Sequence, residues 1–361
     1  MTSARLLDDA RTLARLDPHG AGKTLAEFPA QCRAALVLTA SPPLPRLALR
    51  HIVVAGMGGS ATGGDLLKSL AAHRLRMPVT VWRDYGIPTF VDSNTLVLAT
   101  SYSGNTEETR SALEASRERG AHVAVLTSGG GLGVVARDGE LPMVGLPSGF
   151  MPRLALGYLF LPLLGVLEAA GSPVVSTVER DEALQVLEHM GKELGPASPS
   201  AANEAKRVAL TLQGRIPVFY GGAVTGAVTY RWKTQVEENA KVLAFHGRLP
   251  EVNHNEIEGW GDPLTAAFHA VLLRDPEEGE LVGRRMGLMR ELIGADAGRV
   301  TEVWPRGEGR LARLLSLVYL GDWASYYLAL LRARDPWPVP TLEMIKRRLR
   351  EAEPVISVER R

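Results

Sequence analysis

The sequence has a single cysteine, Cys32, and almost no net charge, +1 over 361 residues. One cysteine excludes a disulfide within the chain and any zinc site built from several cysteines. We therefore expect Cys32 to be a small buried apolar group. The balanced charge gives no electrostatic reason to expect nucleic acid or an acidic membrane as a partner, and we expect neither.

The chain also lacks a long uninterrupted apolar segment. Residues 1–10 include arginine and aspartate in place of an apolar core, so we expect no signal peptide there. The longest apolar run, residues 154–170, is interrupted by two glycines and a proline and is short for a membrane span. The expectation is a soluble protein of the cytoplasm.

What the sequence does have is a 45% apolar content over a length that suits two α/β domains. Short apolar segments at 51–55, 78–82, 95–100, 122–127 and 142–146 alternate with helical or loop segments. This alternation predicts a doubly wound parallel sheet of the α/β class. In such sheets ligands bind beyond the carboxyl ends of the strands.

The pattern repeats in the second half of the chain. An expected strand at 216–220, a glycine-rich turn at 221–226 and a helix at 227–241 resemble the arrangement at 52–70. We therefore predict two doubly wound, flavodoxin-like domains, joined near residues 171–176.

The predicted division of the chain has three parts. They are an N-terminal helical segment over 1–45 with helices at 3–16 and 25–36, a first domain over 46–172, and a second domain over 173–361 that includes the C-terminal helices.

Three hydroxyl residues follow the expected strand at 95–100 and precede a helix at 107–119. They are Ser101, Ser103 and Thr106, and a glycine and Asn105 lie between them. A helix N-terminus offers unpaired N–H groups and a partial positive charge, so hydroxyl donors beside it can bind phosphate without a lysine. The alternative is an ordinary strand–turn–helix in which Asn105 caps the helix.

A second glycine-rich turn, residues 56–65, follows the first expected strand. Gly58, Gly59 and Ser60 again place a hydroxyl at a helix start, so both turns are expected to face one crevice. The same turn partly matches a dinucleotide fingerprint, with Asp84 as the candidate acid, so a Rossmann oxidoreductase is an alternative.

The second half of the chain supplies candidates for acid–base chemistry. Helical spacing places Thr234, Glu238 and Lys241 on one face, and a partly shielded Glu238 can act as a general base. His254, expected in a non-periodic loop, can act as an acid or proton shuttle near neutral pH. The alternatives are a surface salt bridge for Glu238 and a surface histidine.

Two further interpretations concern ions. A metal site at His254 with Glu256 and Glu258 lacks the usual spacing of zinc ligands, and we expect no metal. Arg153 lies at an expected helix start, where a cation is disfavoured, so the position indicates a residue that serves an anion. The alternative is an exposed arginine after a turn.

Five motifs taken together, at 56–65, 100–109, 147–153, 238–241 and 254–260, resemble the bifunctional phosphoglucose/phosphomannose isomerases. This family belongs to the phosphoglucose isomerase superfamily and is built from two sugar isomerase (SIS) domains. The serine-rich turn alone indicates only an SIS domain. The Glu-Asn-Ala-Lys run followed by His-Asn-Glu is more specific to the family.

The resemblance implies a role for each matched residue. The substrate would be approached by Gly58, Gly59 and Ser60, and its phosphate would be held by Ser101, Ser103 and Thr106. Arg153 would stabilise the enediolate, and Glu238 would be the base. His254 would assist ring opening, and Lys346 would face the site from the last helix. The resemblance also implies a homodimer in which the His254 loop reaches the neighbouring subunit's site.

The implied function is an aldose–ketose isomerase that interconverts glucose 6-phosphate, and mannose 6-phosphate, with fructose 6-phosphate. The implied setting is carbohydrate metabolism, in glycolysis and gluconeogenesis. The reaction is expected to need no cofactor. Two alternatives stay open: a non-catalytic SIS protein that senses a sugar phosphate, and the Rossmann dehydrogenase.

Overall fold

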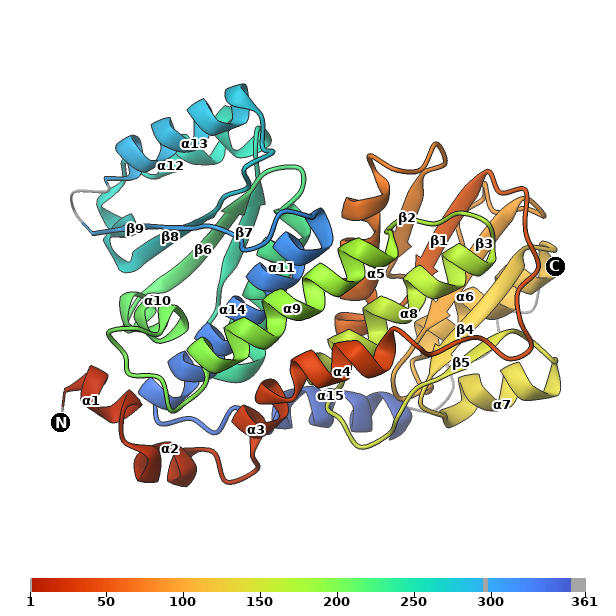
Figure 1. Cartoon of the computed structure of the whole chain (residues 1–361), viewed down its shortest axis with the longest axis horizontal. Helices are drawn as coiled ribbons and strands as arrows, with labels where there is room; N and C mark the ends of the chain where they lie inside the picture. Colours follow the sequence, from red (N-terminus) through yellow and green to blue (C-terminus); the bar gives the residue numbers. More distant parts are fainter. Residues whose placement is uncertain (1, 295–297, 352–361) are drawn as a thin grey trace.

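The computed structural model describes residues 2–294 and 298–351. Two parallel β-sheets lie side by side, each flanked by helices, and the helices α9 (Thr177–Leu194) and α14 (Arg310–Leu331) run between them (Figure 1). The predicted α/β class with two parallel sheets is confirmed. The predicted boundary between residues 172 and 173 falls in the connection between α8 (Leu156–Ala169) and α9, and the domain limits stay a prediction.

The first sheet has five parallel strands in the order β2-β1-β3-β4-β5. This order is that of flavodoxin-like domains and differs from the order in dinucleotide-binding domains. The strands lie within or match the predicted segments: β1 (His51–Ala55), β2 (Val79–Trp82), β3 (Thr95–Thr100), β4 (His122–Thr127) and β5 (Met143–Gly145).

Alternate residues of the first sheet enter two different cores, because side chains alternate along a strand. Ile52 and Val54 pack with α5 (Gly58–Ala71) and α8 on one face. Val53 and Ala55 pack with α6 (Glu107–Glu118) and α7 (Gly130–Asp138) on the other. Helices on both faces explain why β3 is buried along its whole length.

The second sheet has four parallel strands in the order β7-β6-β8-β9. One face packs on α13 (Glu280–Ile293), and the other packs on α11 (Gly226–Gln235) and α14. The strands are β6 (Ile216–Gly221), β7 (Phe245–Arg248), β8 (Phe268–Leu273) and β9 (Val300–Val303).

Helix α14 is the core helix of the molecule. It packs against α9, α11 and α10 (Glu204–Leu212). Within the described residues it is the one helix long and apolar enough to cross a membrane, but 94% of its most apolar window is buried inside the fold. Its apolar character therefore belongs to the packing between the two sheets.

The N-terminal segment departs from the predicted pair of helices. It forms four short helices: α1 (Ser3–Leu7), α2 (Ala10–Leu16), α3 (Ala21–Ala26) and α4 (Phe28–Ala35). The first break arises because Asp9 caps α2, while Asp8 forms an ion pair with buried Lys206 at 3.1 Å. Cys32 in α4 is fully buried, as predicted.

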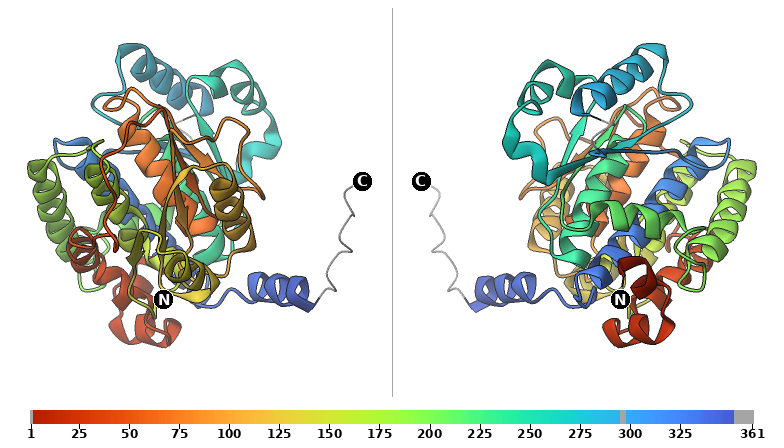
Figure 2. Two further views of the ribbon diagram at one scale, coloured as in Figure 1. Left: turned by 90° about the vertical axis from the view of Figure 1, so that its right-hand side faces the viewer. Right: turned by 90° about the vertical axis from the view of Figure 1, so that its left-hand side faces the viewer.

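The predicted helix at 227–241 also divides. It continues from α11 into a π-helical turn, Val236–Ala240, and ends at Lys241 in a left-handed backbone conformation with φ of 56°. The last helix, α15 (Pro340–Glu351), extends away from the body of the molecule (Figure 2). Its side chains are exposed from Pro340 to Leu349.

Candidate active site

The serine-rich turn after β3 is closed by its own hydroxyls. Ser101 is buried, and its Oγ lies 2.8 Å from Thr106 Oγ1 and accepts a hydrogen bond from the Gly104 N–H at 3.1 Å. Thr106 is the N-cap of α6 and makes no side-chain cap bond. The first-turn N–H groups of α6 are therefore left for a ligand.

Asn105 does not cap α6, because the N-cap is Thr106, so that part of the alternative is wrong. Its Oδ1 instead accepts from the Gly131 N–H at 3.0 Å, which ties the turn to the start of α7. Ser103 is exposed, and its Oγ accepts from the Asn105 N–H at 3.3 Å.

The two predicted turns meet at the carboxyl edge of the first sheet. Ser60 Oγ, in the first turn of α5, accepts from the Tyr102 N–H at 3.3 Å. Gly58 begins α5 with φ of 50°, and a Cβ on Gly59 would lie 2.8 Å from the Pro152 carbonyl oxygen. Glycine at position 59 therefore lets the helix start approach the backbone next to Arg153.

Arg153 lies in a 3-10 turn, Pro152–Leu154, and its side chain is only 4% exposed. The exposed-arginine alternative is therefore wrong. Its Nη2 donates to the carbonyl oxygens of Pro336 at 2.6 Å and Trp337 at 2.7 Å. Burial lowers the pKa of the guanidinium, and the carboxylate of Glu238 opposes this shift.

Glu238 lies in the π-helical turn and brings its carboxylate to Arg153. Its Oε2 is 3.6 Å from Arg153 Nη1, and its side chain is 28% exposed. The carboxylate is thus partly shielded and faces a buried cation. The next residue, Asn239, contacts the same guanidinium through Oδ1, 2.8 Å from Nε. A π-helical turn is often found at a functional site.

Lys241 belongs to this site, although no role was predicted for it. Its Nζ donates to the Glu238 carbonyl oxygen at 2.5 Å. Burial, and secondarily the charge of Arg153, lower the pKa of the amine to about 8, while Asp335 and Glu238 oppose the shift. The sequence does carry a signal for Lys241, since this lysine is the last residue of the Glu-Asn-Ala-Lys run that resembles the family motif.

The segment 335–337 was also missed. Asp335 accepts hydrogen bonds from the Trp337 N–H at 2.9 Å and pairs with His19 Nδ1 at 2.6 Å. The His19 ring stacks on Trp337 with centroids 6.3 Å apart. The N-terminal segment therefore braces the carbonyl groups that hold Arg153, a contact that spans almost the whole chain.

His254 is not part of this cluster. It ends a 3-10 helix, Glu251–His254, where a non-periodic loop was predicted, and its side chain is exposed. The following helix, α12 (Glu256–Gly259), is fastened to β6: Tyr220 Oη hydrogen-bonds Glu256, and Trp260 Nε1 donates to Tyr220 Oη at 2.9 Å. Bonds join the two turns to each other and Arg153 to Glu238. In the described part of the chain, His254 takes part in none of these bonds.

Lys346 lies on α15, which carries it away from the body of the chain (Figure 2). Its place in the site therefore stays a prediction. Within the described residues, no group of three histidine, cysteine or acidic side chains is arranged to hold a metal ion. Glu256, one of the carboxylates considered as a metal ligand, instead accepts a hydrogen bond from Tyr220.

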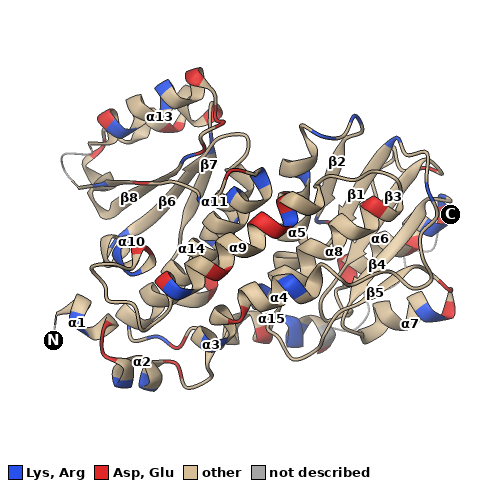
Figure 3. Cartoon of the chain, viewed as in Figure 1, with Lys and Arg blue, Asp and Glu red and all other residues tan. Residues whose placement is uncertain are grey.

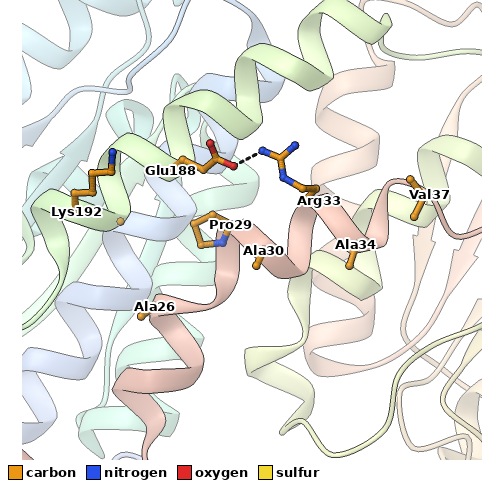
Figure 4. A pocket seen from close by; sticks show the side chains of 9 residues that line it. Ala26, Pro29, Ala30, Arg33, Ala34, Val37, Glu188 and Lys192 are labelled. Carbon is orange, nitrogen blue, oxygen red and sulfur yellow. Dashed lines mark hydrogen bonds and ion pairs between the residues drawn. The ribbon is translucent and has the colours of Figure 1, made fainter.

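A groove of about 720 Å³ lies elsewhere, between α4 and α9 (Figure 4). Small side chains such as Ala30 and Ala34 line it, and an ion pair between Arg33 and Glu188 spans it. None of the predicted site residues borders this groove. Basic and acidic residues are interspersed over both halves of the chain (Figure 3).

Comparison with known proteins finds relatives of this chain. Residues 201–349 match the family model of the bacterial phospho-glucose isomerase C-terminal SIS domain. The chain is 40% identical to the bifunctional phosphoglucose/phosphomannose isomerase of Caldicellulosiruptor bescii, over 83% of this chain and 89% of that protein. It is 37% identical to the enzyme of the same name from Aquifex aeolicus, over 84% and 91%.

A solved structure shares the fold. The crystal structure of a glucose-6-phosphate isomerase like protein from Thermus thermophilus aligns with a TM-score of 0.59 at 24% identity. The alignment covers 91% of this chain and 96% of that one.

Proposed function

This chain belongs to the bifunctional phosphoglucose/phosphomannose isomerase family, and we propose that it interconverts glucose 6-phosphate and mannose 6-phosphate with fructose 6-phosphate. The observation that carries the proposal is the pairing of Glu238 with buried Arg153, 3.6 Å apart, next to the hydroxyl-lined turns. Aldose–ketose isomerisation needs a base near C2 and positive charge beside the developing enediolate, and these two residues supply them.

In the proposed mechanism, the phosphate binds at the starts of α5 and α6. Ser60, Ser101 and Thr106 lie there, with Ser103 at the rim. Helix N-termini favour anions, and the binding energy of this remote group holds the sugar in register. Gly58 and Gly59 keep the approach to the first of these helix starts open.

The carboxylate of Glu238 then removes the C2 proton of the open-chain sugar and returns it to C1, while a second proton passes from O2 to O1. Nη1 of Arg153 stabilises the negative charge on the oxygens of the enediolate between the two steps. This step is a net proton transfer within the substrate and changes no oxidation state of the enzyme.

Ring opening requires a further acid, and we assign it to His254 of a second subunit. Its exposure, and the bonds that tie the helix after it to β6, suit a residue that acts outside its own chain. We extend the proposal to a homodimer, to Lys346 as an additional group of the site, and to a cytoplasmic enzyme of glycolysis and gluconeogenesis.

The alternatives are less well supported. A non-catalytic sensor would need no carboxylate beside a buried arginine, and the chain belongs to a family of isomerases. A Rossmann dehydrogenase is inconsistent with the strand order of the first sheet and with that family.

The test is a coupled assay of the wild type and two neighbouring glutamate variants with each sugar phosphate. Glu238→Gln should lower kcat by about 100-fold or more, because a positioned general base contributes about 10²–10⁴-fold. Glu237→Gln is the matched control: it lies in the same turn but pairs with Lys233 at 2.8 Å.

The control should keep kcat within about threefold of the wild type, since it loses only a partly exposed ion pair. An inactive wild-type protein would refute the proposed activity. An active Glu238→Gln variant would leave the activity standing and refute the assignment of the base.

A further inference from the structure

The amide of Asn239 can point in only one direction. Arg153 Nε donates to Asn239 Oδ1 at 2.8 Å, and Asn239 Nδ2 donates to Ser325 Oγ at 2.9 Å. Ser325 Oγ donates its only proton to the Asp322 carbonyl oxygen at 2.8 Å. A guanidinium can only donate, and a hydroxyl whose proton is engaged must accept, so the amide oxygen faces Arg153.

Two of the three nitrogens of the Arg153 guanidinium donate to neutral acceptors. Nε donates to the amide of Asn239, and Nη2 donates to the carbonyl oxygens of Pro336 and Trp337. Among the residues that the structure describes, the carboxylate of Glu238 is the one within ion-pair distance of this guanidinium, and it faces Nη1. The guanidinium is thus oriented mainly by neutral groups, with the carboxylate of Glu238 at ion-pair distance and the charges of Asp322 and Asp335 also acting on it. Its charge acts in a buried, low-dielectric environment.

We propose that Asn239 is a positioning residue that holds Arg153 by a neutral acceptor, so that the arginine charge and Nη1 stay available to an anionic reaction intermediate. Ser325 takes part by fixing the amide in the orientation that presents its oxygen. The inference rests on the proposed isomerase function, because it assumes that an enediolate forms beside Arg153.

The proposed role of Asn239 depends on the neutral charge of its side chain and not on its shape alone. An aspartate is nearly isosteric with asparagine and would still accept from Arg153 Nε. It would, however, place a second carboxylate against the guanidinium and neutralise it. The change also removes the Nδ2 donor to Ser325. A purely structural role for Asn239 would therefore weaken the binding of charged and neutral ligands alike, while the proposed role weakens the binding of the charged ligand alone.

The experiment compares Asn239→Asp, Ser325→Ala and a control, Ser316→Ala. Ser316 lies on the same helix, is buried, donates to the Arg313 carbonyl oxygen at 2.7 Å and accepts from the Arg306 N–H at 2.8 Å. It therefore matches the local bonding of Ser325 without a link to the site. The measurements are kcat and KM, and the inhibition or dissociation constants of two substrate analogues.

The first analogue is an aldonic acid 5-phosphate, whose carboxylate lies where the enediolate forms. The second is a hexitol 6-phosphate, which is neutral at that place. For Asn239→Asp we expect kcat to fall by about 10- to 100-fold with KM within about threefold. Affinity for the acid should fall by about tenfold or more, while affinity for the hexitol stays unchanged.

Ser325→Ala should shift the same quantities in the same direction by a smaller factor, and Ser316→Ala should shift neither. Asn239→Asp with wild-type affinity for the acid, or with equal losses for both analogues, would overturn the proposal. If that variant does not fold, the same two outcomes for Ser325→Ala decide the question. Analogue binding needs no turnover, so a wild type that binds both compounds without isomerising sugar refutes the proposed function separately.

Discussion

The buried ion pair between Arg231 and Asp322 is the structural support behind the site, and removing one of its charges should be costly. Arg231 Nε and Nη2 donate to the two carboxylate oxygens at 3.0 and 2.8 Å. The side chains are 1% and 3% exposed. Arg231 Nη2 also donates to the Arg153 carbonyl oxygen at 2.5 Å, so the pair holds the backbone of Arg153.

Asp322→Asn keeps the shape of the side chain but leaves the Arg231 guanidinium buried without a countercharge. Breaking a buried pair in this way costs about 3–5 kcal/mol. With an m value of about 3 kcal/mol per molar urea, the midpoint of unfolding should fall by roughly 1–2 M. Glu237→Gln, which breaks the partly exposed pair with Lys233, should cost about 1 kcal/mol or less.

The double variant Arg231→Met with Asp322→Leu separates stability from function. Burial raises the pKa of Asp322, against the influence of Arg231, which indicates that the ionised carboxylate carries a real desolvation cost. Removing both charges should therefore restore stability to within about 2 kcal/mol of the wild type. It should not restore kcat, because the bond to the Arg153 carbonyl is gone.

Urea unfolding followed by tryptophan fluorescence and by circular dichroism measures these differences, and the coupled assay measures kcat. If Asp322→Asn destabilises the protein no more than Glu237→Gln does, the ion pair between Arg231 and Asp322 is not a buried interaction shielded from solvent. If the double variant is fully active, Arg231 has no part in holding the site.

Two further predictions concern the site directly. Lys241, with a pKa lowered to about 8, should be roughly a quarter neutral at pH 7.5, on the order of 100-fold more than an ordinary lysine. An amine-acylating reagent should therefore modify it ahead of exposed Lys23, and sugar phosphate should protect it. Equal labelling of both lysines would contradict this environment. Ser101→Ala with Ser103→Ala should raise KM for glucose 6-phosphate by about tenfold or more. Ser116→Ala, buried in helix α6 that follows this turn, should leave KM unchanged. An unchanged KM in the double variant would place the phosphate elsewhere.

The strands of the first sheet could be predicted closely because their signal is local. β3 and β4 begin and end at the predicted residues, 95–100 and 122–127. Helices cover both faces of this sheet, so each strand is a short apolar run bounded by polar turns. The helix at 3–16 failed for the opposite reason: the ion pair of Asp8 with Lys206, 198 residues away, accompanies a break that helical periodicity does not show.

The residues of the site also fall into those that the sequence predicts and those that it does not. Glu238 and Arg153 could be named from local motifs, but the groups that orient Arg153 could not. Asn239 lies 86 residues from Arg153 in sequence, and Pro336 lies 183 residues away. A carbonyl oxygen carries no sequence signal, since every residue has one. The prediction could therefore supply the charged groups, while the neutral acceptors that keep the charge available emerge only from the fold.

The π-helical turn is where local reasoning and tertiary structure conflict most directly. Regular helical spacing placed Glu238 and Lys241 on one face with Thr234 and gave Asn239 no role. In the structure the widened turn lets two consecutive residues, Glu238 and Asn239, contact one guanidinium, and Lys241 turns back onto the Glu238 carbonyl. An ordinary α-helix separates consecutive side chains by about 100°. The departure from regular geometry therefore lies where the proposed base and a neutral anchor both contact Arg153.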